Sequence, residues 1–340
     1  VRNKHISQGY LTYEFEEKLA EFLNVPYVVC VSSGSAALAL SYIVCGLKPG
    51  DSILTSNVTF VATANASLLL GGKVEAVDVN KRNVMDVESL EKSLSKQTKI
   101  IVPVHMNGCA VEMESVLEIA KKYGLSVVED ACQAFGCRYS YEGSNKGKYL
   151  GTFGRFGCFS LGMAKLLTTG GGGFVVAHTQ EDYDLLCRAR NQGVLDVRKE
   201  RIYKNFGFNF KYTDLQASIG LNQLKNIHKK LNSAKENYLL YKQRLGDKLT
   251  FLESLEGEIP MRVVVLTPKN QEIYDYLLSK NIQCALESQP LSYCEYLGIK
   301  GEFKASDYFE QHKLILPSGP SKSKEEINKV CDEILRFKEL

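Results

Sequence analysis

Short runs rich in valine and isoleucine alternate with helical patterns from residue 27 to residue 178, and this alternation restricts the fold more than any other feature of the chain. Seven runs have the length and apolar character of buried strands: 27–31, 52–56, 74–79, 99–104, 125–130, 157–161 and 173–178. Helical patterns separate the early runs, at 32–46, 59–72, 84–95 and 113–124. Parallel strands need crossovers of this kind, and their sheets are covered on both faces. The sequence therefore predicts an α/β fold with a mainly parallel sheet.

The pattern changes after about residue 212. The segments with clear patterns outside the alternating region are a helix at 12–23, a long helix at 213–246, a strand at 261–268, and helices at 270–282 and 322–340. At 340 residues the chain is long enough for more than one core. We therefore expect a large domain at 10–224 and a smaller α+β domain at 225–340, hinged on the long helix.

Composition excludes several classes of function. The formal net charge of +3 is small for this length and does not indicate a nucleic-acid or membrane-surface protein. No apolar stretch reaches the ~20 residues that a membrane-spanning helix needs, and no secretory pattern opens the sequence. The ten cysteines form no CxxC pair, and most stand in apolar runs, so buried thiols are favoured over a zinc site, and both over disulfides. We expect a cytoplasmic protein without a metal centre.

Lys165 lies in the stretch FSLGMAKLLTTGGGG, five residues after Ser160 and shortly before the four glycines at 170–173. A lysine in a site of low dielectric constant has a lowered pKa and becomes a nucleophile for carbonyl carbons. The glycines would let the backbone turn closely around a bulky ligand. The alternative is a surface lysine that leads into a flexible loop.

Two other strand ends carry groups that would complement such a lysine, because ligands of parallel sheets bind beyond the carboxyl ends of the strands. Gly34 and Ser35 follow the first strand and open a helix, whose N-terminus suits a phosphate. The alternative there is an N-cap at Ser33 with a tight turn. Asp130 ends the strand at 125–130, and Gln133 follows it; the carboxylate would be costly to bury unless it is paired with a cation. The alternative for Asp130 is a cap for a following helix.

Five stretches together resemble one family. They are VSSGSAALAL, SNVTFVATANA, VVEDACQAFG, FSLGMAK with its GGGG, and NFGFNFKYTDLQASIG. In order and separation they are similar to the motifs of the DegT/DnrJ/EryC1/StrS sugar aminotransferases. The resemblance covers about residues 8–225 and is weaker in the C-terminal third. It implies a pyridoxal-phosphate-dependent transferase of fold type I, with a mainly parallel seven-stranded sheet and a smaller C-terminal domain.

The resemblance also implies roles for single residues. Lys165 corresponds to the catalytic lysine that holds the cofactor covalently, and Asp130 to the partner of its pyridine nitrogen. Gln133 corresponds to the residue that contacts the phenolic oxygen. Phe60 corresponds to the aromatic side chain stacked on the ring.

The phosphate of the cofactor would be held from two chains. Gly34, Ser35 and Ser160 match phosphate-binding positions of the family. Asn209, in the stretch FGFNFKY, matches an asparagine that reaches the phosphate from the neighbouring subunit. The resemblance thus implies a homodimer with composite active sites; the local alternative is a turn asparagine that bonds its own backbone. From the sequence itself we expect Phe206, Phe208 and Phe210, which alternate with it, to be buried.

The expected reaction is the transfer of an amino group, with glutamate as donor, to a nucleotide-linked keto-sugar in amino-sugar biosynthesis. The sequence departs from the family at Tyr13, in ESQPLSYCEYLG at 287–298, and in the Gly-Met-Ala before Lys165, where the family commonly has His-x-x-Lys. Members that eliminate a hydroxyl carry histidine at the position of the lysine, which argues against a sugar dehydratase. An amino-acid aminotransferase or cysteine desulfurase would use an arginine of the small domain, and few arginines follow residue 225. A non-catalytic protein that retains the fold remains a further alternative, whereas a nicotinamide enzyme lacks its GxGxxG.

Overall fold

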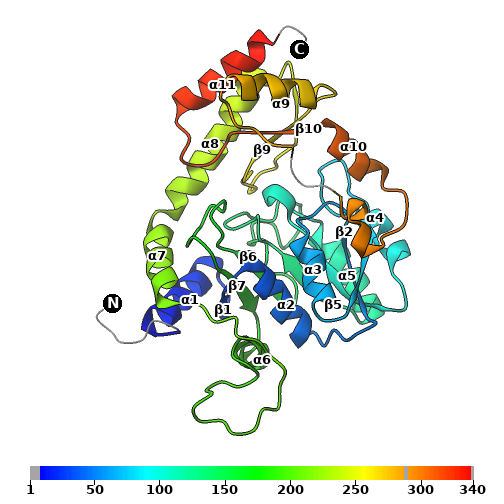
Figure 1. Cartoon of the computed structure of the whole chain (residues 1–340), viewed down its shortest axis with the longest axis vertical. Helices are drawn as coiled ribbons and strands as arrows, with labels where there is room; N and C mark the ends of the chain where they lie inside the picture. The colour runs from blue at the N-terminus through cyan, green and yellow to red at the C-terminus, as the bar shows by residue number, and fades with distance from the viewer. Residues whose placement is uncertain (1–7, 287–289, 338–340) are drawn as a thin grey trace.

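The computed structural model describes residues 8–286 and 290–337. Its main element is a seven-stranded sheet in the order β1-β7-β6-β5-β4-β2-β3 (Figure 1), which confirms the predicted α/β fold. Only β7 runs antiparallel to its neighbours, β1 and β6. The strands are β1 (Tyr27–Val31), β2 (Ser52–Ser56), β3 (Lys73–Val77), β4 (Thr98–Val102), β5 (Ser126–Asp130), β6 (Phe156–Ser160) and β7 (Gly173–Ala177).

Both faces of this sheet are covered by helices. In β1, Val28 and Cys30 belong to one buried cluster, and Val29 and Val31 belong to the other. The first face packs against α1 (Tyr10–Leu23) and α5 (Met113–Tyr123), and the second against α2 (Gly34–Val44), α3 (Ala62–Leu68) and α6 (Gln180–Arg190). Burial on both faces explains why the strands read as continuous apolar runs and not as alternating ones.

Two predicted helices are wrong in extent. The segment 84–95 contains only α4 (Val87–Leu90) and one 3₁₀ turn, and Asp86 caps α4 by accepting from the backbone N–H of Glu88. The long helix at 213–246 is two helices, α7 (Asp214–Lys225) and α8 (Ile227–Leu245), because Asn226 leaves the helical region at φ −107° and ψ 11°.

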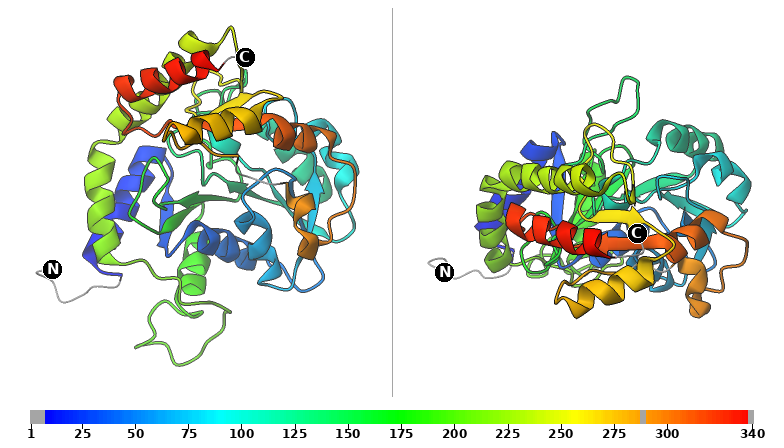
Figure 2. Two further views of the ribbon diagram at one scale, coloured as in Figure 1. Left: turned by 45° about the horizontal axis from the view of Figure 1, so that its top comes forward. Right: turned by 90° about the horizontal axis from the view of Figure 1, so that it is seen from above.

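The C-terminal domain has its own small sheet and core. Its elements besides α8 are β8 (Thr250–Phe251), β9 (Val263–Leu266), α9 (Asn270–Ser279), α10 (Lys304–His312), β10 (Lys313–Leu316) and α11 (Lys324–Arg336). The strands form an antiparallel sheet in the order β10-β9-β8, and α8, α9 and α11 enclose a separate buried cluster above the large sheet (Figures 1 and 2). Ser323 and Glu326 form a reciprocal capping box at the start of α11.

The chain returns from this domain to the large sheet between residues 290 and 312. Leu291 is fully buried in the cluster around α2, and its N–H donates to the carbonyl of Asn57 at 2.7 Å. Asp78, just beyond β3, accepts from the backbone N–H and the hydroxyl of Ser306 at 2.9 and 2.6 Å. Two segments of the C-terminal part are therefore anchored on the large domain.

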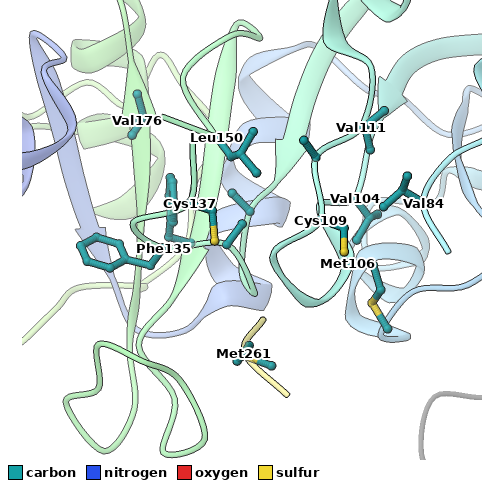
Figure 3. Close-up of a cluster of buried hydrophobic side chains, with 14 of the residues drawn as sticks. Val84, Val104, Met106, Cys109, Val111, Phe135, Cys137, Leu150, Val176 and Met261 are labelled. Carbon is teal, nitrogen blue, oxygen red and sulfur yellow. The ribbon is translucent and has the colours of Figure 1, made fainter. Parts of the chain in front are cut away.

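Met261, a residue of the C-terminal part, is also buried in the core of the large domain. It lies just before β9, and Figure 3 shows it below Phe135 and Cys137 of the large domain, in the same buried cluster. All ten cysteines lie in the described part of the chain as free thiols, and seven of them are buried. Among residues 8–286 and 290–337, no helix combines the length and the apolarity that crossing a membrane requires.

Candidate active site

Gly34 lies where three of the predicted stretches meet. β1, β5 and β6 end at the same edge of the sheet, and α2 begins directly beyond β1. A Cβ atom at Gly34 would lie 3.0 Å from Cys132 Sγ and 3.0 Å from Ser160 Cβ, closer than most real contacts of a Cβ atom. The structure therefore brings Gly34, the segment after Asp130, and Ser160 together, as the sequence predicts.

The first turn of α2 offers free backbone donors at this junction. Ser33 is the N-cap, and its hydroxyl accepts from the N–H of Ala36 at 3.0 Å. The amides of Gly34 and Ser35 lie ahead of any intrahelical acceptor. The N-cap interpretation is confirmed, and it is compatible with an anion site, because the cap leaves two donors and the positive end of the helix dipole available.

Asp130 ends β5 as a buried carboxylate, only 6% exposed. Its Oδ2 accepts from the hydroxyl of Thr63 at 2.7 Å, and its Oδ1 accepts from the N–H of Cys132 at 3.1 Å. No helix begins after it, since the described residues 131–137 form turns, so the helix-cap alternative is wrong. Both donors are neutral, and within residues 8–286 and 290–337 no cation contacts this buried carboxylate, a condition that a cationic ligand would relieve.

Thr63 connects Asp130 to the loop that carries Phe60. Its hydroxyl lies 2.8 Å from that of Thr59 and 3.1 Å from the carbonyl of Phe60. The ring of Phe60 is 66% exposed, which is unusual for a phenylalanine that follows a fully buried strand. Thr63 is not among the site residues predicted from the sequence, although it stands in the same motif as Phe60.

Beneath Asp130, Glu129 forms a fully buried hub. Its carboxylate accepts from His105 Nε2 at 2.9 Å and from the backbone N–H groups of Gly151, Phe153 and Gly154 at 2.6–2.9 Å. Burial raises the pKa of Glu129, but the His105 interaction and these amides outweigh it and hold the pKa below its usual value. His105 Nδ1 accepts from a backbone N–H, so Nε2 carries the proton. The hub joins β5, the segment that follows β4, and the 151–154 loop behind Asp130.

We predict that Glu129→Gln lowers the free energy of unfolding by about 2–4 kcal/mol. Either orientation of the new amide places its NH₂ group against two donors, because each carboxylate oxygen now accepts two hydrogen bonds. Urea denaturation of the purified variant measures the change. Glu253→Gln, at an exposed glutamate, is the control and should change the value by less than ~0.5 kcal/mol. Equal stability of both variants would contradict the structural role of the hub.

Gln133 is oriented by a neighbour that the sequence analysis did not identify. The N–H of Asn107 donates to Gln133 Oε1 at 3.1 Å, which fixes the amide so that its NH₂ group is the donor end. Asn107 is buried in the left-handed region, at φ 56°, which is uncommon for a residue other than glycine. Its side chain bonds both the N–H and the carbonyl of Arg262, each at 2.8 Å. Asn107 therefore ties the start of β9 to Gln133.

Lys165 lies in a turn after β6, with its backbone N–H donating to the carbonyl of Gly162 at 3.0 Å. It is half-buried, and within the described residues its ammonium group makes no hydrogen bond or ion pair. Its charge reaches the thiol of Cys132: burial and the charge of Asp130 raise the pKa of Cys132 well above its usual value, and Lys165 opposes this. Lys165 and Asp130 therefore act on the same small volume, which argues against a lysine directed into solvent.

Backbone conformation and close packing explain several of the glycines after Lys165. Gly170 and Gly172 lie in the left-handed region, at φ 79° and 117°. A Cβ at Gly172 would clash with the ring of Tyr212, and one at Gly173 would clash with the backbone of Ser33. Close packing of chain on chain, and not only room for a ligand, therefore explains two of the four positions.

Asn209 is the one predicted residue that the structure does not bring to the others. It is exposed, and its side chain bonds no other described residue. Its segment pairs with the chain near α2, where the N–H of Ser32 donates to the carbonyl of Phe210 at 3.0 Å. Phe206 is 63% exposed, so the expectation that all three phenylalanines are buried is wrong for the single chain.

Comparisons with known proteins agree on one group of enzymes. Residues 1–335 match the sequence model of the DegT/DnrJ/EryC1/StrS aminotransferase family. The chain is 30% identical to the GDP-perosamine synthase of Escherichia coli O157:H7, over 97% of this chain and 91% of the relative. It is 28% identical to a UDP-4-amino-4,6-dideoxy-N-acetyl-beta-L-altrosamine transaminase of Campylobacter jejuni, over 93% and 87%. The solved structure of PseC from Helicobacter pylori, an aminotransferase of pseudoaminic acid biosynthesis, superposes with a TM-score of 0.90 at 27% identity, covering 98% of this chain and 93% of that one.

Proposed function

Since the chain belongs to the DegT/DnrJ/EryC1/StrS aminotransferase family, we propose that it transfers an amino group from L-glutamate to the ketone of a nucleotide-linked sugar, with pyridoxal 5′-phosphate as cofactor. The names of its relatives support a nucleotide-sugar substrate, because they are a GDP-perosamine synthase and a UDP-amino-sugar transaminase. The observation that carries the proposal is the convergence of Lys165, the buried Asp130 and the N-terminus of α2 at one edge of the sheet.

The residues at this edge fit the proposed cofactor. The amides of Gly34 and Ser35, with the hydroxyl of Ser160 beside them, would hold its phosphate. The close approach at Gly34 supports this, because a side chain there would push α2 away from Ser160. Asp130 would pair with the protonated ring nitrogen, which supplies the cation that its buried charge lacks.

The remaining groups fit the ring itself. The NH₂ group of Gln133 would donate to the phenolic oxygen, for which Asn107 has already set its orientation. The exposed ring of Phe60 would stack on one face of the cofactor. When bound, pyridoxal phosphate supplies an electrophilic carbon for amines and a ring that withdraws electrons.

The chain itself supplies the proton transfer. Lys165 Nζ would take the proton from the α-carbon of the amino donor. It would later give a proton to the sugar carbon that receives the amino group. Asp130 would place its negative charge opposite the protonated ring nitrogen of the cofactor. Thr63 and the N–H of Cys132 keep this carboxylate oriented.

The function is tested with purified protein, pyridoxal phosphate, glutamate and a panel of UDP-, GDP- and dTDP-linked keto-sugars. Mass spectrometry detects the amino sugar, and a coupled assay detects 2-oxoglutarate. Formation of both products supports the proposal. Transfer to 2-oxo acids but to no sugar would instead indicate an amino-acid aminotransferase, and a lack of visible cofactor absorbance would indicate a non-catalytic protein.

We further propose a homodimer in which Asn209 completes the phosphate site of the partner subunit. The segment that carries it is exposed and apolar in the single chain: Ile202, Tyr203 and Phe206 are 71%, 55% and 63% exposed. Figure 1 shows this segment as a long loop below α6, away from the body of the molecule. Such a patch is expected to be covered, and a second copy of the chain is the proposed cover.

Mixing two inactive variants tests the shared site. A heterodimer of Lys165→Ala and Asn209→Asp chains would carry both lesions in one site and none in the other. We expect each heterodimer to recover up to half the activity of a wild-type dimer, measured after subunit exchange is demonstrated by native mass spectrometry. No recovery after demonstrated exchange, with both homodimers inactive, would place Asn209 in the site of its own chain.

A further inference from the structure

The backbone of the turn that carries Lys165 is closed at Leu161. The carbonyl of Leu161 accepts from the N–H of Thr169 at 3.0 Å, and its N–H donates to the carbonyl of Gly172 at 2.8 Å. Residues 161–169 therefore leave β6 and return to it, with Lys165 in the middle, and we call them the lysine turn. The position of the amine depends on this backbone, because the ammonium group itself bonds no other described residue.

The end of the lysine turn is bonded to Tyr212, which stands just before α7. The hydroxyl of Tyr212 donates to Thr169 Oγ1 at 2.7 Å, and the hydroxyl of Thr169 donates in turn to the carbonyl of Gly171. The side chain of Gln216, in α7, donates to the same carbonyl at 3.1 Å. Tyr212 is fully buried and Thr169 is 3% exposed, so water does not compete for the bond between them.

Tyr212 is itself fixed by the large domain. Its ring stacks on that of Phe15 at a centroid distance of 6.2 Å, and its carbonyl accepts from the N–H of Gln8 at 3.2 Å. A Cβ atom at Gly172 would lie 2.4 Å from its ring, so the ring lies directly against the chain that follows the lysine turn. Burial raises the pKa of Tyr212 well above its usual value, so the phenol stays protonated and remains a donor.

The hydroxyl of Tyr212 can be separated from the packing of its ring. A phenylalanine would keep the contacts of the ring, but it could not bond Thr169, which follows Lys165 by four residues. The lysine turn is also anchored by Leu166 and Leu167, which are 4% and 0% exposed. Loss of the hydroxyl should therefore loosen the turn without unfolding it. A reacting group displaced by about 1 Å can still lose a large part of its rate.

We propose that Tyr212 is a positioning residue, whose hydroxyl holds the lysine turn closed through Thr169 and thereby places the amine of Lys165 for proton transfer. This rests on the proposed function, in which Lys165 moves the proton. Tyr212 would touch neither the cofactor nor the substrate and would act only through the turn.

Hydrogen–deuterium exchange of the cofactor-free protein tests the closure of the turn. In Tyr212→Phe the amides of residues 161–172 should exchange about tenfold faster than in the wild type, because the bond that holds Thr169 is lost. Thr169→Val should have the same effect, whereas Thr169→Ser keeps the hydroxyl and should not. Tyr238→Phe is the matched control, because Tyr238 is also buried and its hydroxyl donates to the carbonyl of Leu252 at 3.1 Å. It should leave the exchange of residues 161–172 unchanged.

Kinetics of the cofactor-loaded enzyme test the consequence for Lys165. Tyr212→Phe should lower kcat about tenfold and change the KM for glutamate less than twofold, because it alters the placing of the amine and no contact with substrate. The double variant Tyr212→Phe/Thr169→Val should be no slower than the slower single variant, since both changes remove one bond. Trapping of Lys165 with pyridoxal phosphate and borohydride, followed by mass spectrometry, measures the amine without turnover and should be slower in the same variants.

Three results would overturn the inference. In the first, Tyr212→Phe matches the wild type in exchange, trapping and kcat. In the second, residues 161–172 exchange faster while trapping and kcat stay unchanged, so closure of the turn does not place the amine. In the third, exchange rises over the whole chain and equally in Tyr238→Phe, which would make the hydroxyl a general contribution to stability.

The test remains decisive if one variant or the proposed reaction fails. If Tyr212→Phe does not fold, Thr169→Val and Thr169→Ser carry the comparison. If the lysine turn loosens and trapping slows in the variants while the wild type aminates no keto-sugar, the positioning of Lys165 stands and the proposed reaction fails. The two failures can therefore be distinguished.

Discussion

Lys165→Ala is expected to abolish turnover, with a loss on the order of 10⁴-fold or more in kcat, while the fold stays intact. The physical reason is the position of the residue. It is half-buried in a turn, its ammonium group bonds no described residue, and its truncation removes no core packing. Lys211 pairs with Val31 at the end of β1, but its ammonium group donates to Asn191 Oδ1 at 3.1 Å, so we do not expect it to replace the amine of Lys165.

The measurement combines steady-state kinetics with thermal melting and a visible spectrum. The melting temperature should change by less than a few degrees, and the cofactor should bind without the spectral signature of a covalent link. Lys121→Ala, at an exposed lysine of α5, is the matched control and should retain full activity. Substantial turnover by the Lys165 variant would refute the proposed mechanism.

Asp130→Asn should lower kcat/KM by about 10³-fold or more while keeping the shape of the side chain. The new amide can still accept one of the two hydrogen bonds, from Thr63 or from the N–H of Cys132, so the loop should persist. What it loses is the buried negative charge, and that charge is the proposed support for a protonated ring nitrogen. The effect is therefore electrostatic and should appear in the chemical step.

Single-turnover kinetics with glutamate isolate that step. Thr63→Val is the informative comparison, because it removes one donor to Asp130 and keeps the charge; its loss should be much smaller. A decrease of less than tenfold for Asp130→Asn would mean that the carboxylate only holds the turn at 131–137. A matching decrease in both variants would mean that orientation, and not charge, is what Asp130 contributes.

The strands were predictable because burial on both faces leaves a simple signal. The runs at 27–31 and 52–56 coincide with β1 and β2, since each is apolar and bounded by turn residues. The helix predicted at 84–95 does not form over that length. Val84 and Met85 are buried by tertiary contacts and not by a helical face. α6 was missed although Thr179 and the acids after it are a regular N-terminal signal.

The residues of the candidate site also differ in whether the sequence could predict them. Gly34, Asp130 and Lys165 could be found because each follows a predicted strand, and strand ends of parallel sheets converge. Asn107 could not, because its role depends on contacts with Gln133 and with Arg262, which is 155 positions away. The proposed role of Asn209 depends on a second chain, so the contacts within one chain do not test it.

The return of the chain to the large domain between residues 290 and 312 affects which segments could be exchanged between related enzymes by recombination. The N–H of Leu291 bonds the backbone carbonyl of Asn57, whose side chain bonds both the N–H and the hydroxyl of Ser292. Ser306 bonds the side chain of Asp78, so the C-terminal domain is interrupted by a segment that packs on the large domain. A single crossover near residue 225 would transplant this segment together with the domain around it. The recipient would then have to supply an asparagine and an aspartate at matching positions. Recombination between relatives is therefore constrained by two distant pairs of residues.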